Sequence, residues 1–317
     1  MSPKQRPRAT KPRSTQREGD LLTVPVVTYR GSVKASECDH WGHLGTQYYL
    51  AKADDAQAAL CCELGLAPSW LRSRNAAMVL RRNRVMFKRE LRAGDAVHVR
   101  SGVREAQEST LRFCSVLYGE LDTQSAVFES EARLVDRTTG IPIDLPTQAI
   151  ERGVELAVSD VTFPMPQPLG NPRPPARTPP QAMLTQRGAL GAWGRDDTGL
   201  APPHFMIPRF SAAMTGLMAH LGLSRPVLLS RHLGYAALDC GFEHPALLRP
   251  GQSVDIRSGV LEVRRKALRI FHQVLDTTSG DVVAAMEVVL VFFDLRARKS
   301  VVMPEEILAR AGEFTPG

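Results

Sequence analysis

The chain has 317 residues, a hydrophobic fraction of 43% and a formal net charge of +7. This length allows one large domain or two domains of about 150 residues, each with a packed core. No apolar run approaches the roughly 20 residues of a membrane-spanning helix, and no secretory signal follows the start. The composition therefore excludes a helical membrane protein and favours a soluble one.

The positive charge is concentrated in an N-terminal tail. The first 17 residues include no acid and six basic residues: Lys4, Arg6, Arg8, Lys11, Arg13 and Arg17. Without these six, 34 basic residues stand against 33 acidic ones, so the rest of the chain is nearly neutral. We expect residues 1–20 to form a disordered basic tail, and we expect no nucleic acid and no membrane among the partners.

The cysteines indicate a reducing environment. The chain has five, at positions 38, 61, 62, 114 and 240, and none forms a Cys-x-x-Cys pair. An odd number without metal-binding spacing is typical of reduced thiols. We therefore expect a cytoplasmic protein. We also expect no metal site and no cofactor.

The first half predicts one helix followed by four antiparallel strands. After a strand over 21–33, a helix is expected over 47–64, where apolar residues recur at spacings of three and four. Strands are expected over 78–91, 96–103, 111–120 and 125–136, with turn residues between them. One helix and an antiparallel sheet make an α+β unit.

The second half repeats the first. Shifted by 157 positions, residues 30–113 are identical to their counterparts at 24 of 84 positions, which indicates a duplicated domain. Ten prolines between positions 142 and 180 predict an extended linker between the copies. We expect domains at 21–146 and 183–303, a linker at 147–182 and a C-terminal tail at 304–317. The copies should pair, because an unpaired one would expose a sheet edge.

The residues richest in chemistry lie between the first strand and the helix, at 36–49. Asp39, Gly42, His43 and Gly45 stand in the turn before the helix N-terminus. Free N–H groups point outward there and the helix dipole is positive, which suits chemistry on a carbonyl group.

This stretch resembles the hotdog-fold thioesterases, in particular the 4-hydroxybenzoyl-CoA type. The matching motifs are Glu37-x-Asp39-x-x-Gly42, Tyr48-Tyr49, Gly94-Asp95 and Asp136-x-x-Thr139-Gly140-x-Pro142. The resemblance implies two hotdog domains, each an antiparallel sheet wrapped around a central helix, packed as a pseudo-dimer. It also implies metal-free hydrolysis of acyl-CoA or acyl-ACP thioesters at sites between the two units.

The resemblance suggests roles for three catalytic candidates. Asp39 would attack the thioester or activate a water, although an aspartate here also forms Asx turns and helix caps. The Thr46 backbone N–H would polarise the carbonyl. His43 would orient a water or bind substrate, and a structural role for it stays open.

Further candidates concern substrate binding. Gly42, Gly45 and Tyr48 belong to the signature itself. Lys88 and Arg89 could bind CoA phosphates, or simply end a strand in solvent. Asp54 falls where some relatives carry an acid, but the polar face of a helix also explains it.

The second copy differs at the same positions. Asp196 and Gly199 persist, whereas His43 is replaced by Leu200, and Gly45-Thr46 by two prolines at 202 and 203. Proline has no N–H to offer a carbonyl. The sequence therefore predicts one working site, led by Asp39, with the second copy as its structural partner.

Three other functions can be compared with these residues. An acyl-ACP thioesterase would show Asp-x-Asn-x-His, which Asp39 and His43 match but Trp41 does not. A hotdog hydratase would show Asp-x-Asn-Pro-x-His, which both copies lack. A non-catalytic acyl-CoA-binding or regulatory protein is also compatible, as is a homodimer of these double-hotdog chains.

Overall fold

The computed structural model describes residues 25–39, 41–160, 163, 177–191, 199–201 and 203–315. The expectations for the basic tail, for residues 161–162 and 164–176 of the proline-rich segment and for Asp196 fall outside these residues.

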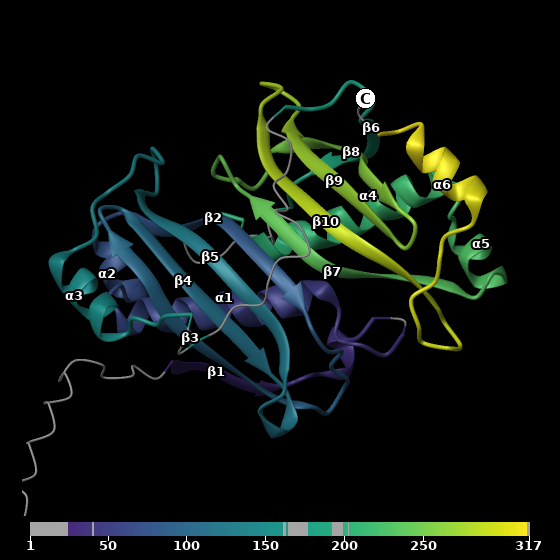
Figure 1. Cartoon of the computed structure of the whole chain (residues 1–317). Helices are drawn as coiled ribbons and strands as arrows, with labels where there is room; N and C mark the ends of the chain where they lie inside the picture. The colour runs from purple at the N-terminus through teal and green to yellow at the C-terminus, as the bar shows by residue number, and fades with distance from the viewer. Residues whose placement is uncertain are drawn as a thin grey trace, which may run out of the picture.

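The first half contains one long helix and an antiparallel set of strands (Figure 1). Strand β1 (Val26–Ser32) leads through the 3-10 turn η1 (Ala35–Glu37) to helix α1 (Thr46–Glu63) and the short helix α2 (Pro68–Ser73). The strands β2 (Ala76–Phe87), β3 (Ala96–Gln107), β4 (Thr110–Tyr118) and β5 (Gln124–Asp136) follow, with η2 (Glu120–Asp122) before β5. The predicted order of one helix and four strands is confirmed.

The second half repeats this order. Strand β6 (Met183–Ala189) precedes the 3-10 turn η3 (Pro203–Met206), helix α4 (Ile207–His220) and the short helix α5 (Arg225–Ser230). Four strands complete it: β7 (Leu233–Glu243), β8 (Ser253–Arg264), β9 (Ala267–Asp276) and β10 (Val282–Asp294).

The ten strands of the described residues form one sheet, in the order β1-β3-β4-β5-β2-β7-β10-β9-β8-β6. The copies meet where β2 pairs antiparallel with β7, with Arg82 opposite Glu243 and Met86 opposite Asp239. Helices α1 and α4 lie on the same face of this sheet (Figure 1). The pairing covers edges that each copy alone would expose, which confirms the predicted pseudo-dimer.

Helix α1 buries one stripe of its surface. Tyr49, Ala53, Ala56 and Leu60 recur at helical spacing and are buried. Gly65, with φ of +80°, follows the helix in the left-handed conformation that commonly ends one. The largest core cluster includes Leu50 and Phe128 of the first copy together with Phe210 and Phe242 of the second. The two copies therefore share one core.

Part of the expected extended linker is helical. Residues Thr147–Glu155 form helix α3, which packs on β3 so closely that a Cβ at Gly153 would lie 2.8 Å from that of Ala106. The extended interpretation is wrong for these residues because the ten prolines are unevenly placed: none falls between 147 and 163. The predicted C-terminal tail likewise contains helix α6 (Glu305–Gly312), which packs against β8.

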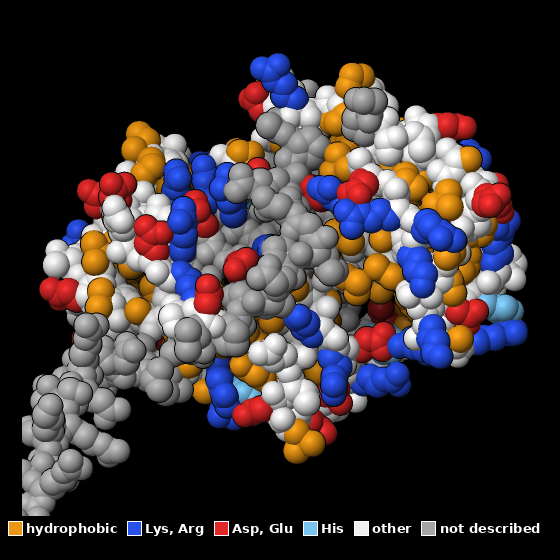
Figure 2. All heavy atoms as spheres, in the orientation of Figure 1, with side chains coloured by type: hydrophobic (Ala, Val, Ile, Leu, Met, Phe, Trp, Pro, Cys, Tyr) orange, Lys and Arg blue, Asp and Glu red, His pale blue; other side chains and the backbone are white. Residues whose placement is uncertain are grey.

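Charges of both signs are mixed on the face of the molecule that Figure 2 shows. In the face shown in Figure 2, basic side chains stand beside acidic ones without forming a continuous basic band. None of the described helices is long and apolar enough to cross a membrane. Within the same residues, no group of three or more His, Cys, Asp and Glu side chains could hold a metal ion.

Candidate active site

The signature turn is held in place by backbone contacts at both ends. Cys38 forms a β-bridge with Leu44, and His43 forms one with Arg92. The Leu44 N–H donates to the Leu91 carbonyl at 2.7 Å, and Gly45 is the N-cap of α1. These contacts place residues 38–45 directly at the N-terminus of the central helix.

The Asp39 carboxylate organises this turn. Its Oδ1 accepts hydrogen bonds from the N–H groups of Trp41 at 2.8 Å and His43 at 3.2 Å. The Asp39 N–H donates to the His43 carbonyl at 2.7 Å, and the residue is exposed. The Asx-type turn that the sequence left open is therefore present, with the carboxylate accessible to solvent. Gly42, with φ of +77°, takes a turn conformation that a side chain would strain.

Glu37 joins the turn to the side of α1. Its Oε2 accepts from Lys52 Nζ at 2.9 Å and from the Lys34 N–H at 3.0 Å. Burial alone would raise the pKa of Glu37, but the Lys34 N–H and the Lys52 ammonium together lower it. Lys52 is itself buried, under the ring of Tyr29. Glu37 therefore has a structural role, since it links the turn to α1.

Thr46 is the first residue of α1 and is half-buried. In the described part of the chain its N–H finds no hydrogen-bond partner. This is the free donor that the sequence predicts at the helix start. Tyr48, two residues further along α1, is half-buried against the large core cluster.

His43 faces the second copy and not the Asp39 carboxylate. Its Nε2 lies 3.2 Å from Glu90 Oε2 and 3.3 Å from Arg92 Nη2. Glu90 in turn accepts a hydrogen bond from Arg298 of the second copy at 2.5 Å. Only the backbone of His43 contacts Asp39. The side chain of His43 interacts with Glu90 and Arg92 instead.

Lys88 and Arg89 follow directly after β2. Both are exposed, and their N–H groups donate to the Ser125 carbonyl at 2.8 Å and 3.1 Å. The buried Tyr49 of α1 donates its hydroxyl to the Arg89 carbonyl at 3.2 Å. The strand end is therefore tied to the first turns of α1, with two cationic side chains in solvent beside it.

The second copy differs from the first at its helix start. Gly199 keeps the left-handed φ, at +82°, and Leu200 is buried with Ala77 and Val135. The counterpart of Thr46 is Pro203, the first residue of η3. The neighbouring residues Asp196 and Pro202 lie outside the described residues.

A close pair that the sequence did not predict joins the two copies. His204 Nδ1 lies 2.5 Å from Asp54 Oδ2, between η3 and the middle of α1. Burial raises the pKa of Asp54, while hydrogen bonds and charge from His204 oppose that rise. The sequence contains both residues, Asp54 as an acid on the predicted helix and His204 at the position equivalent to Gln47. Only the packing of the copies joins them.

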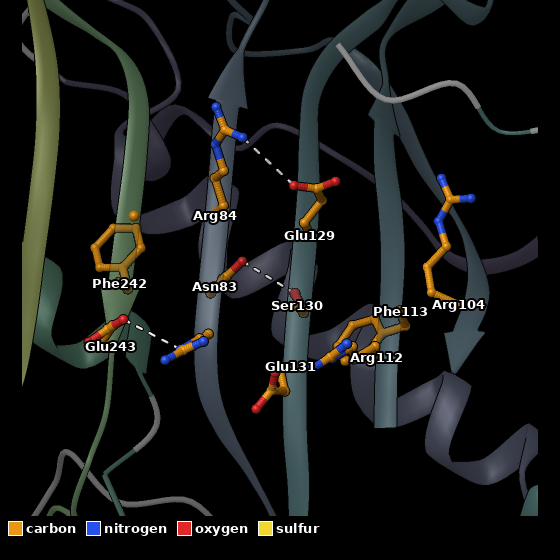
Figure 3. Close-up of a pocket in the computed structure, with 12 residues that line it drawn as sticks. Asn83, Arg84, Arg104, Arg112, Phe113, Glu129, Ser130, Glu131, Phe242 and Glu243 are labelled. Carbon is orange, nitrogen blue, oxygen red and sulfur yellow. Dashed lines mark hydrogen bonds and ion pairs between the residues drawn. The ribbon is translucent and has the colours of Figure 1, made fainter. Parts of the chain in front are cut away.

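A hollow of about 270 Å³ opens elsewhere, on the face of the sheet away from α1 (Figure 3). Its charged side chains pair with one another: Arg82 lies 3.4 Å from Glu243, and Arg112 lies 3.2 Å from Glu131. None of the signature residues lines it. We therefore do not assign the reaction to this hollow.

Comparison with known proteins agrees with the fold. The sequence model of the thioesterase-like superfamily matches residues 33–171 and 204–311, which include most of both copies. The chain belongs to the thioesterase-like superfamily. Its class of chemistry is therefore thioester hydrolysis. No curated protein shows a significant match to the sequence.

Several solved structures share the tandem arrangement. A provisionally assigned oleoyl thioesterase from Lactobacillus plantarum has a TM-score of 0.67 and 12% identity, covering 86% of this chain and 98% of that one. An acyl-ACP thioesterase from Bacteroides thetaiotaomicron has a TM-score of 0.62 and 14% identity, with coverages of 84% and 96%. The 12:0-ACP thioesterase from Umbellularia californica has a TM-score of 0.59 and 14% identity, covering 84% of this chain and 93% of that one. At these identities the likeness shows a common double-hotdog fold.

Proposed function

We propose that this thioesterase-like chain hydrolyses acyl-CoA to a free acid and CoA, with its leading centre at the start of α1. One observation carries the proposal: the Thr46 N–H has no partner among the described residues, and the Asp39 carboxylate stands in the turn before it. A preorganised donor stabilises the oxyanion that forms when a thioester carbonyl is attacked. A nearby carboxylate supplies the base or the nucleophile.

The turn geometry supports this role for Asp39. Its Oδ1 is held by the N–H groups of Trp41 and His43, which fixes the carboxylate and leaves Oδ2 to act. In the base form of the mechanism, Oδ2 takes a proton from water, and the water oxygen attacks the carbonyl carbon. The C–S bond then breaks and CoA leaves as the thiolate. In the nucleophile form, Oδ2 attacks directly and water cleaves the resulting anhydride.

Other residues of the turn would bind the substrate. Gly42 and Gly45 present bare backbone beside the helix start, and Tyr48 lies in the first turn of α1. His43, which faces Glu90 and Arg92, would line the side toward the second copy. The exposed Lys88 and Arg89 would attract the CoA phosphates.

Acyl-ACP is the alternative carrier. Two of the tandem structures with the same fold are named as ACP thioesterases. Exposed cationic side chains such as Lys88 and Arg89 would also suit an acidic carrier protein. Thiol release from matched acyl-CoA and acyl-ACP substrates distinguishes the two, and tight acyl-CoA binding without release from either would instead indicate a binding protein.

The test of the leading centre is the Asp39→Asn variant. An asparagine Oδ1 still accepts the hydrogen bonds of Trp41 and His43, so the turn should persist while the negative charge is lost. We expect kcat for thiol release to fall about a hundredfold. Asp55→Asn, at an exposed acid of α1, is the matched control and should leave kcat unchanged. An Asp39→Asn variant as active as the wild type would contradict the assignment.

A further inference from the structure

The Asp54–His204 pair lies at the boundary of the two copies, away from the Asp39 turn in sequence. Asp54 belongs to the third turn of α1, and His204 belongs to η3, which leads into α4. Helix α1 packs directly against η3. The pair is thus the pseudo-symmetric counterpart of the α1 start, on the side that the sequence predicts to be inactive.

The pair has the geometry of a general base and the residue that orients it. His204 Nδ1 lies 2.5 Å from Asp54 Oδ2, and the His204 backbone N–H also donates to this carboxylate. Because an ionised carboxylate only accepts, the bond puts the ring proton on Nδ1 and leaves Nε2 as the acceptor. Nε2 makes no hydrogen bond with the described residues.

The pair is shielded but still reaches solvent. The side chains of Asp54 and His204 are 20% and 19% exposed. The His204 ring lies beside that of Phe205, with ring centroids 4.4 Å apart and the planes tilted by 34°. Asp55, on the same helix, is the other ionisable group that acts on Asp54, and it raises the Asp54 pKa. A partly shielded histidine that water can still approach suits proton transfer.

The duplication shows that the copies can pack without such a pair. On the other side of the pseudo-dimer, the counterparts of His204 and Asp54 are Gln47 and Ser211. These two residues make no hydrogen bond to each other. Since uncharged residues suffice at the equivalent positions, the repeated fold does not itself require an ionisable pair there.

We propose that Asp54 and His204 form a second hydrolytic centre, in which His204 Nε2 is the general base and Asp54 positions its ring. This rests on the proposed thioester hydrolysis. His204 Nε2 takes a proton from water, and the water oxygen bonds to the thioester carbonyl carbon. The tetrahedral intermediate then collapses, the C–S bond breaks, and the thiolate recovers the proton from Nε2. The products are the free acid and the thiol, and Asp54 stabilises the intervening imidazolium.

The second centre should be slower than the first. Pro203 stands where Thr46 offers its N–H, so one oxyanion donor is missing. The loss of one such donor lowers kcat about a hundredfold or more. In the wild type the first centre would therefore dominate, and the second would be seen once Asp39 is removed.

The experiment measures thiol release from the best acyl thioester in the Asp39→Asn background. We expect the remaining rate to fall to the uncatalysed level in Asp39→Asn/His204→Gln, where glutamine copies the residue at 47. The pH profile of the remaining rate should also change when His204 is replaced. In the same background, Asp54→Asn should lower the remaining rate of thiol release at least tenfold, and Asp54→Glu should retain part of that rate. Ser211→Ala, at the equivalent position of the other copy, should change nothing.

Each failure has a distinct meaning. A wild-type chain that releases thiol from no acyl-CoA or acyl-ACP overturns the proposed function and this inference together. An active wild type whose Asp39→Asn variant already has the uncatalysed rate overturns the inference alone. The same holds if folded Asp39→Asn and Asp39→Asn/His204→Gln release thiol equally fast with the same pH profile. Circular dichroism establishes the fold of each variant.

Discussion

At the scale of single residues, two buried histidines of the second copy are held neutral. His272 is fully buried, with Nδ1 2.5 Å from Ser258 Oγ, and burial lowers its pKa to about 3. Burial, together with the charge of Arg81, lowers the pKa of His244 to about 4. In the unfolded chain both would titrate near the ordinary value of about 6.5.

These histidines predict a loss of stability in mild acid. Below about pH 6.5 these two histidines are protonated in the unfolded chain but stay neutral in the folded chain, so acidification favours unfolding. The free energy of unfolding should fall by about 1.4 kcal/mol per pH unit for each histidine, down to its folded pKa. Urea unfolding at pH 7, 6 and 5 measures this slope.

The first copy shows which residue can replace His272. The buried chain Thr185–Ser258–His272 corresponds to Thr28–Ser101–Ser115 in the first copy, so His272→Ser copies a tolerated arrangement. The variant should lose the part of the slope that His272 contributes. Carboxylates whose pKa is lowered act only near and below about pH 4, outside this window. An unchanged slope would contradict the neutral state of His272.

The residue scale also shows which site features a sequence can predict. The Asp39 turn was recognisable because its hydrogen bonds connect residues at most four apart, which the spacing Asp-x-x-Gly encodes. The contact between Asp54 and His204 spans 150 residues. No local pattern encodes it, since it depends on how two helices meet across the copies.

At the scale of elements, the start of α1 is the feature to test. Proline is well tolerated at the first position of a helix, because its N–H would be unsatisfied there in any case. Thr46→Pro should therefore keep the fold while it removes the donor, which gives α1 the same start as η3. We expect kcat for thiol release to fall about a hundredfold with little change in melting temperature.

Thr46→Ala is the control for the side chain. It keeps the N–H and removes the hydroxyl and methyl groups, so its kcat should stay close to that of the wild type. If Thr46→Ala were as slow as Thr46→Pro, the side chain and not the backbone donor would be responsible.

Elements were predictable where periodicity was strong. The helix over 47–64 and the four strands after it agree with α1 and β2–β5 to within a few residues at most ends. Helix α3 was missed because the prolines on both sides dominated the composition of the segment. The residues between them fold as a helix that buries Ala149 and Gly153, which is a tertiary effect.

At the scale of the whole molecule, the two copies behave as one folding unit. They share a sheet through β2 and β7 and a core cluster that contains side chains of both. The sequence repeat predicted that the copies pair. It did not predict which side chains join them, because the repeated positions carry different residues in each copy.

One joining contact is a buried ion pair. Asp239 of β7 is fully buried, and Arg84 of β2 donates to it through Nε at 2.9 Å and Nη2 at 2.5 Å. Arg84→Met should cost about 3 kcal/mol of unfolding free energy, because it leaves a buried carboxylate without its guanidinium. Urea unfolding measures the loss, which should appear as one cooperative transition of both copies.

The next pair along the same strands is the control. Arg82 lies 3.4 Å from Glu243, but its side chain is 56% exposed, so Arg82→Met should cost less than about 1 kcal/mol. The double variant Arg84→Met/Asp239→Leu should recover most of the stability, because an apolar pair of similar size avoids the desolvation of both charges. Equal losses from Arg82→Met and Arg84→Met would mean that burial does not distinguish the two pairs. The continuous core, rather than this ion pair, would then hold the copies together.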